Sequence, residues 1–279
     1  MSDVATIPIE DPSDRRIEVF QGLRDKALRQ RREGPGGDMA GVFIAEGDIV
    51  IERAVVAGYE LISALIDAQR TQALPAVMAG RPVYAAGPAV LENIAGYGSY
   101  RGALACFRRR SVSTLADLLD DTDIRSFVIV EGVNNPTNLG VILRCAAGLG
   151  IEALVLAPNA CDPLSRRCCR VSMGEGFALP YAWLPDVPGG FAALRAAGVD
   201  VLAMTPAADA TAIDELRFAP TDRVGILLGA EGPGLSAEAM GCASRPVRIP
   251  MSRAVDSINV GTAGAVSFFA LQQARKSNS

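Results

Sequence analysis

The sequence contains no histidine among its 279 residues. This absence excludes Ser-His-Asp and Cys-His nucleophilic chemistry and any histidine general base. The six cysteines form no C-x-x-C pair, so without histidine we also expect no metal site. If the chain is an enzyme, its proton transfer falls to Arg, Lys, Asp, Glu or Tyr.

Long hydrophobic runs are missing as well. The longest apolar stretch, residues 258–271, contains Asn259, Thr262 and Ser267 and is shorter than the roughly 20 residues that cross a bilayer. The N-terminal residues are acidic where a signal peptide has a basic and then an apolar segment. We therefore expect a cytoplasmic protein with no membrane partner and with reduced cysteines.

Lysine is scarce, since 25 of the 27 cationic residues are arginine. The net charge of −4 argues weakly against a nucleic-acid partner, but the guanidinium group forks onto phosphates and stacks on bases. The arginines form two clusters, which we interpret either as RNA contacts or as solvated surface charge: Arg101, Arg108, Arg109 and Arg110, and Arg166, Arg167 and Arg170.

The length is sufficient for about two domains. An acidic stretch at residues 117–123 separates two alternating patterns, and we place the domain boundary near residue 112. Residues 1–112 are expected to form a small α/β domain behind a polar arm whose helix has one weak apolar face, formed by Ile17, Phe20, Leu23 and Leu28. Strands are expected at 42–45, 61–66, 82–85 and 102–107, and helices at 47–57, 69–79 and 88–95.

The second domain, residues 113–279, contains apolar runs without alternating polarity. Such runs are typical of parallel strands that helices cover on both faces. We therefore expect a doubly wound α/β domain with strands at 127–130, 153–156, 199–204 and 225–228. Asp256 or Ser257 is expected to cap a final helix that ends near residue 275.

Ligands of parallel α/β sheets bind at the carboxyl ends of the strands, so the loops that follow strands indicate the site. The first such loop opens a helix within residues 133–147. Thr137 or Asn138 is expected to cap that helix, and Gly140 permits close approach at its first turn. Arg144 lies four residues after Gly140, so both residues are expected on one helix face, although a capped helix with a surface arginine gives the same pattern.

A second loop, residues 229–236, has the sequence GAEGPGLS and is called the glycine-rich loop below. Its Glu231 would repel a phosphate and suits a cationic nucleoside. The loop matches neither G-x-x-x-x-G-K-[ST] nor G-x-G-x-x-G, which disfavours ATP and NAD.

A third loop spans residues 247–261 and leads into the last helix. Met251 and Ile258 can form apolar walls for a flat ring, and Asn259 can donate and accept hydrogen bonds. The same residues also fit an ordinary strand, loop and capped helix.

Three motifs occur in order: N-P-x-N-L-G-x-x-x-R-x-A, G-A-E-G-x-G-L-S and I-P-M-x(5)-S-I-N-V. Over about residues 125–275 they closely resemble the motifs of SpoU-type (TrmH-like) RNA ribose 2′-O-methyltransferases of the SPOUT superfamily. Residues 43–47 and 101–105 are similar to the small RNA-binding domain of that family. One departure is that Tyr100-Arg101 stands where members often have histidine, which leaves the substrate more open than the chemistry.

The resemblance implies a trefoil-knotted α/β domain that binds S-adenosylmethionine, and a homodimer formed through the C-terminal domain. An apolar last helix with Phe268, Phe269 and Leu271 adds to the expectation of a dimer. The catalytic residues implied are Asn138, Arg144, Glu231 and Asn259. The cofactor-binding residues implied are Thr205, Gly229, Glu231, Gly232, Ile249, Met251, Ile258 and Asn259.

The leading hypothesis is therefore an S-adenosylmethionine-dependent methyltransferase acting on a ribose 2′-hydroxyl of structured RNA. Large-subunit ribosomal RNA is favoured over tRNA because of the separate N-terminal domain. A guanidinium stays protonated far above neutral pH, so phosphate clamping and orientation are favoured for Arg144 over the role of a base. The alternatives are a tRNA ribose or base-nitrogen methyltransferase, and a non-catalytic RNA-binding or ribosome-assembly factor.

Overall fold

A computed structural model of the chain describes residues 4–23, 31–34, 36–95, 102–252 and 257–276. The chain forms two compact units. Unit 1 consists of Met1–Ser111 and Leu164–Phe177, and unit 2 consists of Val112–Pro163 and Ala178–Ser279. Leu164–Phe177 thus packs with unit 1, although its position in the sequence led us to expect it in the second domain.

Unit 1 contains a five-stranded sheet with the order β1-β4-β3-β5-β2. β1 pairs parallel with β4 and β4 with β3, whereas β5 pairs antiparallel with β3 and with β2. The strands are β1 (Ile7–Ile9), β2 (Val42–Glu46), β3 (Leu61–Asp67), β4 (Val83–Ala86) and β5 (Ala103–Arg108). The helical elements are η1 (Arg15–Phe20), α2 (Asp48–Val56), η2 (Ala76–Met78), α3 (Pro88–Ala95), α6 (Arg166–Val171) and η3 (Glu175–Ala178).

Leu164–Phe177 completes the core of unit 1. Phe177 packs 5.7 Å from Phe43 and 5.5 Å from Tyr59, measured between ring centroids. Two oxygens of one carboxylate, Glu46 on β2, accept hydrogen bonds of 2.8 Å from Arg166 and 2.8 Å from Arg170, one turn apart on α6. Apolar and charged contacts together therefore fix this segment on β2.

Unit 2 contains a seven-stranded, wholly parallel sheet with the order β10-β12-β9-β11-β6-β7-β8. Its strands are β6 (Ser126–Val130), β7 (Ala153–Leu156), β8 (Tyr181–Trp183), β9 (Val199–Met204), β10 (Thr211–Ala212), β11 (Arg223–Leu228) and β12 (Arg245–Arg248). The helical elements are α4 (Leu115–Asp120), α5 (Pro136–Gly148), α7 (Val187–Ala196), η4 (Ile213–Glu215), α8 (Ala237–Cys242) and α9 (Val260–Lys276). The expected α/β fold with a parallel sheet is confirmed.

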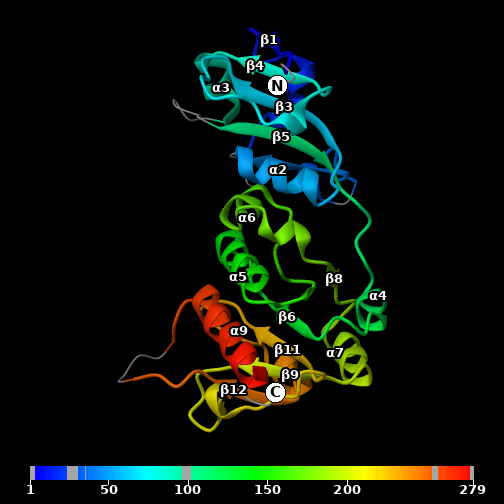
Figure 1. The fold of residues 1–279 in the computed structure, drawn as a ribbon, viewed down its shortest axis with the longest axis vertical. Coiled ribbons are helices and arrows are strands. Elements are labelled where there is room, and N and C mark those ends of the chain that lie inside the picture. Colours follow the sequence, from blue (N-terminus) through cyan, green and yellow to red (C-terminus); the bar gives the residue numbers. More distant parts are fainter. Residues whose placement is uncertain (1–3, 24–30, 35, 96–101, 253–256, 277–279) are drawn as a thin grey trace. The chain divides into compact units, whose positions relative to one another are not determined.

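Helices cover both faces of this sheet, with α5 and α9 together on one face and α4 and α7 on the other (Figure 1). The α4 and α7 face packs on alternate strand residues such as Phe127 and Ile129. On the other face, a Cβ added at Gly261 of α9 would lie 2.7 Å from the Val141 side chain of α5. Glycine at this position therefore allows the two helices to approach closely.

One expectation about local structure is wrong, and three short strands were not expected. Residues 69–79 form no long helix, because Pro75 is extended (ψ 131°) and only the short η2 follows it. In the N-terminal arm, the described residues form η1 and the unexpected strand β1, and residues 31–33 are helical; Leu28 lies outside the described residues. The short strands β8 and β10 were also not expected. Among the described residues, no helix is long and apolar enough to span a membrane.

Candidate active site

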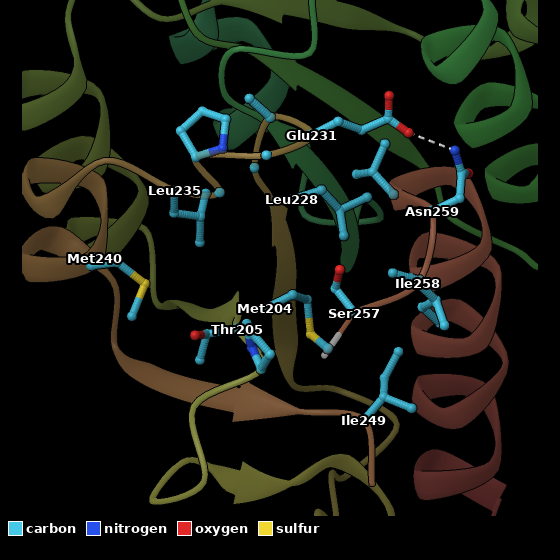
Figure 2. A pocket seen from close by; sticks show the side chains of 18 of the residues that line it. Met204, Thr205, Leu228, Glu231, Leu235, Met240, Ile249, Ser257, Ile258 and Asn259 are labelled. Atoms are coloured by element: carbon cyan, nitrogen blue, oxygen red, sulfur yellow. Dashed lines mark hydrogen bonds between the residues drawn. The ribbon is translucent and has the colours of Figure 1, made fainter. Parts of the chain in front are cut away.

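A cavity of about 750 Å³ lies at the carboxyl ends of β9, β11 and β12 in unit 2 (Figure 2). Its volume is within the usual range for small-molecule sites. Its described lining comes from the ends of these strands, the glycine-rich loop and the first turn of α9: Met204, Thr205, Pro206, Leu228, Gly229, Ala230, Glu231, Gly232, Pro233, Gly234, Leu235, Met240, Ile249, Met251, Ser257, Ile258, Asn259, Val260 and Ala263.

The structure brings together the residues to which the family resemblance assigns cofactor contacts. Each of them lines the cavity: Thr205, Gly229, Glu231, Gly232, Ile249, Met251, Ile258 and Asn259. Sequence reasoning missed several apolar lining residues, including Met204, Leu228 and Met240. Met204 and Leu228 are the last residues of β9 and β11, so their position at strand ends was the signal that could have indicated them.

The glycine-rich loop is a tight turn whose shape requires glycine. Ala230 and Gly234 exchange backbone hydrogen bonds of 3.2 and 3.1 Å. Gly232 and Gly234 have φ values of 90° and 73°, a region that side chains disfavour. A Cβ added at Gly229 would lie 2.5 Å from the backbone of Gly234 and Leu235. At Gly229, Gly232 and Gly234 the loop therefore presents backbone without side chains to the cavity.

Asn259 links three of the four expected catalytic residues. Its Nδ2 donates to Glu231 Oε1 at 2.6 Å, which Figure 2 shows, and to Asn138 Oδ1 at 3.2 Å. Its Oδ1 accepts from the backbone N–H groups of Gly261 and Thr262 at 2.9 and 3.3 Å. Asn259 thus caps α9 and holds Glu231 in place.

The caps of both helices at the site differ from expectation. Helix α9 begins at Val260 and is capped by Asn259, so Ser257 is not the cap, and Asp256 lies outside the described residues. Helix α5 is capped by Asn135, whose side chain accepts from Thr137 N at 2.9 Å. Neither Thr137 nor Asn138 is that cap. Asn138 lies inside the first turn of α5 and is free to bond Asn259.

Arg144 lies one turn after Gly140 on α5 and is exposed, whereas Gly140 is buried. It is not among the described residues that line the cavity. Gly140 and Arg144 both lie on α5, but Gly140 is buried and the Arg144 guanidinium is part of the helix surface, so the shared face stays a prediction.

The cavity has the chemistry that S-adenosylmethionine requires. Leu228, Ile249 and Ile258 supply apolar walls for a flat ring (Figure 2). Glu231 is the one charged side chain among the described lining residues, which favours a cationic ligand over an anionic one. In the described part of the chain, no group of three or more His, Cys, Asp or Glu side chains is placed to hold a metal ion.

The described members of both arginine clusters lie in unit 1. Arg108 pairs with Glu60 at 2.8 Å, and Arg109 donates to the Val42 carbonyl at 3.0 Å. Arg110 donates to the Ala57 carbonyl at 3.0 Å and lies 4.4 Å above the centre of the Tyr59 ring. Protein contacts therefore orient these guanidinium groups, as Glu46 orients Arg166 and Arg170. Arg167 is exposed, and Arg101 lies outside the described residues.

Comparison with known proteins gives consistent matches. Residues 125–269 match the model of the SpoU rRNA Methylase family. An uncharacterised tRNA/rRNA methyltransferase of Mycobacterium bovis is 37% identical over 262 residues, which cover 93% of this chain and 89% of that protein. The 23S rRNA (guanosine-2′-O-)-methyltransferase RlmB of Burkholderia is 26% identical over 198 residues, 70% of this chain and 78% of that protein.

A solved structure supports the same assignment. The AdoMet-bound rRNA methyltransferase of Sinorhizobium meliloti has a TM-score of 0.76 and 25% identity, covering 96% of this chain and 98% of that chain. Together with the family match, this confirms the predicted enzyme class and the predicted cofactor, S-adenosylmethionine. The chain belongs to the SpoU rRNA Methylase family and is an S-adenosylmethionine-dependent RNA methyltransferase.

Proposed function

We propose that this enzyme methylates a ribose 2′-hydroxyl of structured RNA, and that the RNA is large-subunit ribosomal RNA. The RlmB relatives, whose names specify the 2′-oxygen of guanosine in 23S rRNA, support this assignment. The main structural support for the proposal is the hydrogen-bonded set of Glu231, Asn259 and Asn138. This set joins the apolar cavity to the first turn of α5.

The roles of the residues follow from their chemistry. Bound S-adenosylmethionine supplies an electrophilic methyl carbon, so the protein has mainly to place the 2′-hydroxyl in line with it. The lining residues named by the family resemblance hold the nucleoside, and Glu231, fixed by Asn259, faces the cationic end. Arg144 stays protonated at neutral pH, and we assign it to clamping a phosphate and orienting the ribose.

We further propose unit 1 as the RNA-binding part of the enzyme. Arg108, Arg110, Arg167 and Arg170 are exposed there, and with Arg101, Arg109 and Arg166 they would contact phosphates. Some of these groups are already paired with carboxylates, as Arg170 is with Glu46, so RNA has to share or replace those pairs.

We also propose a cytoplasmic homodimer formed through unit 2, whose C-terminal segment is threaded as a trefoil knot. Phe268 and Leu271, which contributed to this expectation, are buried within their own unit, so the contact falls to Phe269 and Val266, which are 54% and 38% exposed on α9. Light scattering on the full chain should give twice the chain mass, and Phe269→Glu should give the single-chain mass.

One experiment tests the reaction. Total RNA is incubated with the enzyme and a labelled methyl donor and is then hydrolysed with alkali, which leaves a linkage intact only where the 2′-oxygen is blocked. We expect the label in alkali-resistant dinucleotides of large-subunit ribosomal RNA. Label in alkali-sensitive nucleotides would indicate base methylation. Label in tRNA would identify tRNA as the substrate in place of ribosomal RNA. No label in any RNA would contradict the proposed substrate.

A further inference from the structure

Glu131 is a buried acidic residue that the mechanism above does not use. It follows β6 directly and is 6% exposed. A buried carboxylate costs free energy unless it is hydrogen-bonded. Both of its oxygens have a partner in Ser236: Oε1 accepts from the Ser236 hydroxyl at 2.6 Å, and Oε2 accepts from the Ser236 N–H at 2.9 Å.

These contacts connect Glu131 to both ends of the glycine-rich loop. The Glu131 N–H donates to the carbonyl of Leu228, the residue before the loop, at 2.9 Å. Its side chain holds Ser236, the last residue of the loop, whose hydroxyl also caps α8 by accepting from Ala239 N at 3.0 Å. The residue that follows β6 therefore fixes where the loop begins and where it ends.

The loop needs such support because its own sequence does not determine one conformation. Glycines lose more conformational freedom than other residues when they are ordered. The part between the two anchors includes Gly229, Glu231 and Gly232, all of which line the cofactor cavity, and it forms the upper edge of the cavity in Figure 2. Glu131 itself is not among the described lining residues.

We propose that Glu131 is a positioning residue that holds the glycine-rich loop in the conformation that binds S-adenosylmethionine. It acts through Ser236 and touches neither cofactor nor RNA. The inference rests on the assignment of the cavity as the cofactor site and not on the choice of RNA.

The test compares full-length Glu131→Ala, Glu131→Gln and Ser236→Ala with a matched control, Glu152→Ala. Glu152 accepts backbone N–H groups of Arg125 and Ser126 at 2.6 and 2.8 Å, but at the opposite end of β6. Calorimetry with S-adenosylhomocysteine should show a Kd raised at least about tenfold by Glu131→Ala, the usual scale for losing hydrogen bonds to a charged group. Glu131→Gln keeps one acceptor oxygen and should recover part of the affinity, while Glu152→Ala should leave Kd unchanged.

Three further readouts separate positioning from general destabilisation. The KM for S-adenosylmethionine should rise in Glu131→Gln while kcat at saturating donor stays near the wild-type value. RNA affinity should not change. Adding Ser236→Ala to Glu131→Ala should raise the Kd by less than the two separate effects combined, because both substitutions remove the same hydroxyl–carboxylate hydrogen bond. If Glu131→Ala does not fold, Glu131→Gln and Ser236→Ala decide the question.

Two outcomes would overturn the inference: wild-type affinity in all three variants, or an equal loss of affinity in Glu152→Ala. Failure of the proposed reaction is distinguishable, since it is a wild-type enzyme that binds S-adenosylhomocysteine normally but methylates no ribose.

Discussion

The two units differ in sheet type and in charge. Unit 1 has a mixed sheet with 17 basic and 15 acidic residues, and unit 2 has a parallel sheet with 10 and 16, so the net charges of +2 and −6 give the total of −4. The total conceals this division. An acidic unit suits a cationic cofactor and a basic unit suits RNA, so the charge of an entire chain is a poor guide to its partners.

The largest expected effect concerns the separate folding of the units. A chain ending at residue 112 lacks Leu164, Cys169 and Phe177, which are buried in the core of unit 1. We expect it to show no cooperative thermal unfolding by circular dichroism, because the loss of several buried side chains exceeds the stability of a small domain. Joining residues 164–177 to it through a flexible linker should restore a cooperative transition. Equal melting of both chains would show that the segment is dispensable.

The second effect separates chemistry from binding within unit 2. Arg144→Ala should reduce single-turnover methyl transfer at saturating RNA by roughly 100-fold or more, the scale for a lost positioning group. The affinity for S-adenosylhomocysteine should be nearly unchanged, since Arg144 does not line the described cavity. Arg144→Lys should rescue little, because lysine lacks the planar fork. Arg195→Ala, an exposed arginine on α7, is the control. A wild-type rate in Arg144→Ala would mean that another group orients the 2′-hydroxyl.

The third effect concerns the backbone of the glycine-rich loop. Gly229→Ala would place a methyl group 2.5 Å from backbone atoms of Gly234 and Leu235. Because backbone does not give way easily, the affinity for S-adenosylhomocysteine should fall about tenfold or more, as overpacking by 1–3 kcal/mol predicts. Gly241→Ala, where the added carbon meets nothing within 4 Å, should bind normally. Unchanged affinity in Gly229→Ala would mean that the loop moves freely.

A smaller effect is expected for RNA binding by unit 1. Replacing Arg108 and Arg110 with Ala should weaken RNA binding several-fold and reduce the salt dependence by about one ion per lost phosphate contact. Cofactor affinity should not change. Arg245→Ala removes an exposed arginine of unit 2 and should leave RNA binding intact. If the RNA affinity of the variant and of the wild type depends equally on salt, these arginines make no phosphate contacts.

The smallest effect concerns the reactivity of two cysteine thiols, one in each unit, which should be similarly low. Burial raises the pKa of the Cys106 thiol in unit 1 to about 11 and that of Cys161 in unit 2 to about 12. Both groups therefore stay protonated below these values, and their thiolates form only as the pH rises toward them. At pH 8 we expect little alkylation by iodoacetamide, measured by mass spectrometry, and more as the pH approaches 10. Rapid labelling of Cys161 in the folded protein at pH 8 would contradict the raised pKa of this half-buried thiol.

The sequence predicts the central strands of unit 2 well and the edges poorly. β6 and β11 are recognisable because strands buried on both faces are continuously apolar. Edge strands such as Tyr181–Trp183 and Thr211–Ala212 are only a few residues long, and pairing with a neighbour forms them rather than any local pattern. The helix expected at 69–79 fails for a local reason, the proline within it.

The candidate site divides in the same way. The second and third motifs predict many of the residues that line the cavity, because each follows a strand end, whereas the described lining includes no residue of the first motif. They do not predict that Asn259 caps α9 while it holds Glu231, or that Glu131 bonds Ser236, because these hydrogen bonds join residues 28 and 105 positions apart. Such contacts depend on the folded sheet, which brings the ends of β6 and β11 together.

The ion pairs between Glu46 and α6 limit how enzymes of this kind can acquire a new substrate specificity by recombination. A recombination event that exchanged only the first 112 residues would separate this carboxylate from Arg166 and Arg170 and would leave Phe177 without its aromatic partners. The exchangeable module is therefore discontinuous in the gene. A functional hybrid has to inherit two pieces of coding sequence from the same parent, although only one of them resembles a domain.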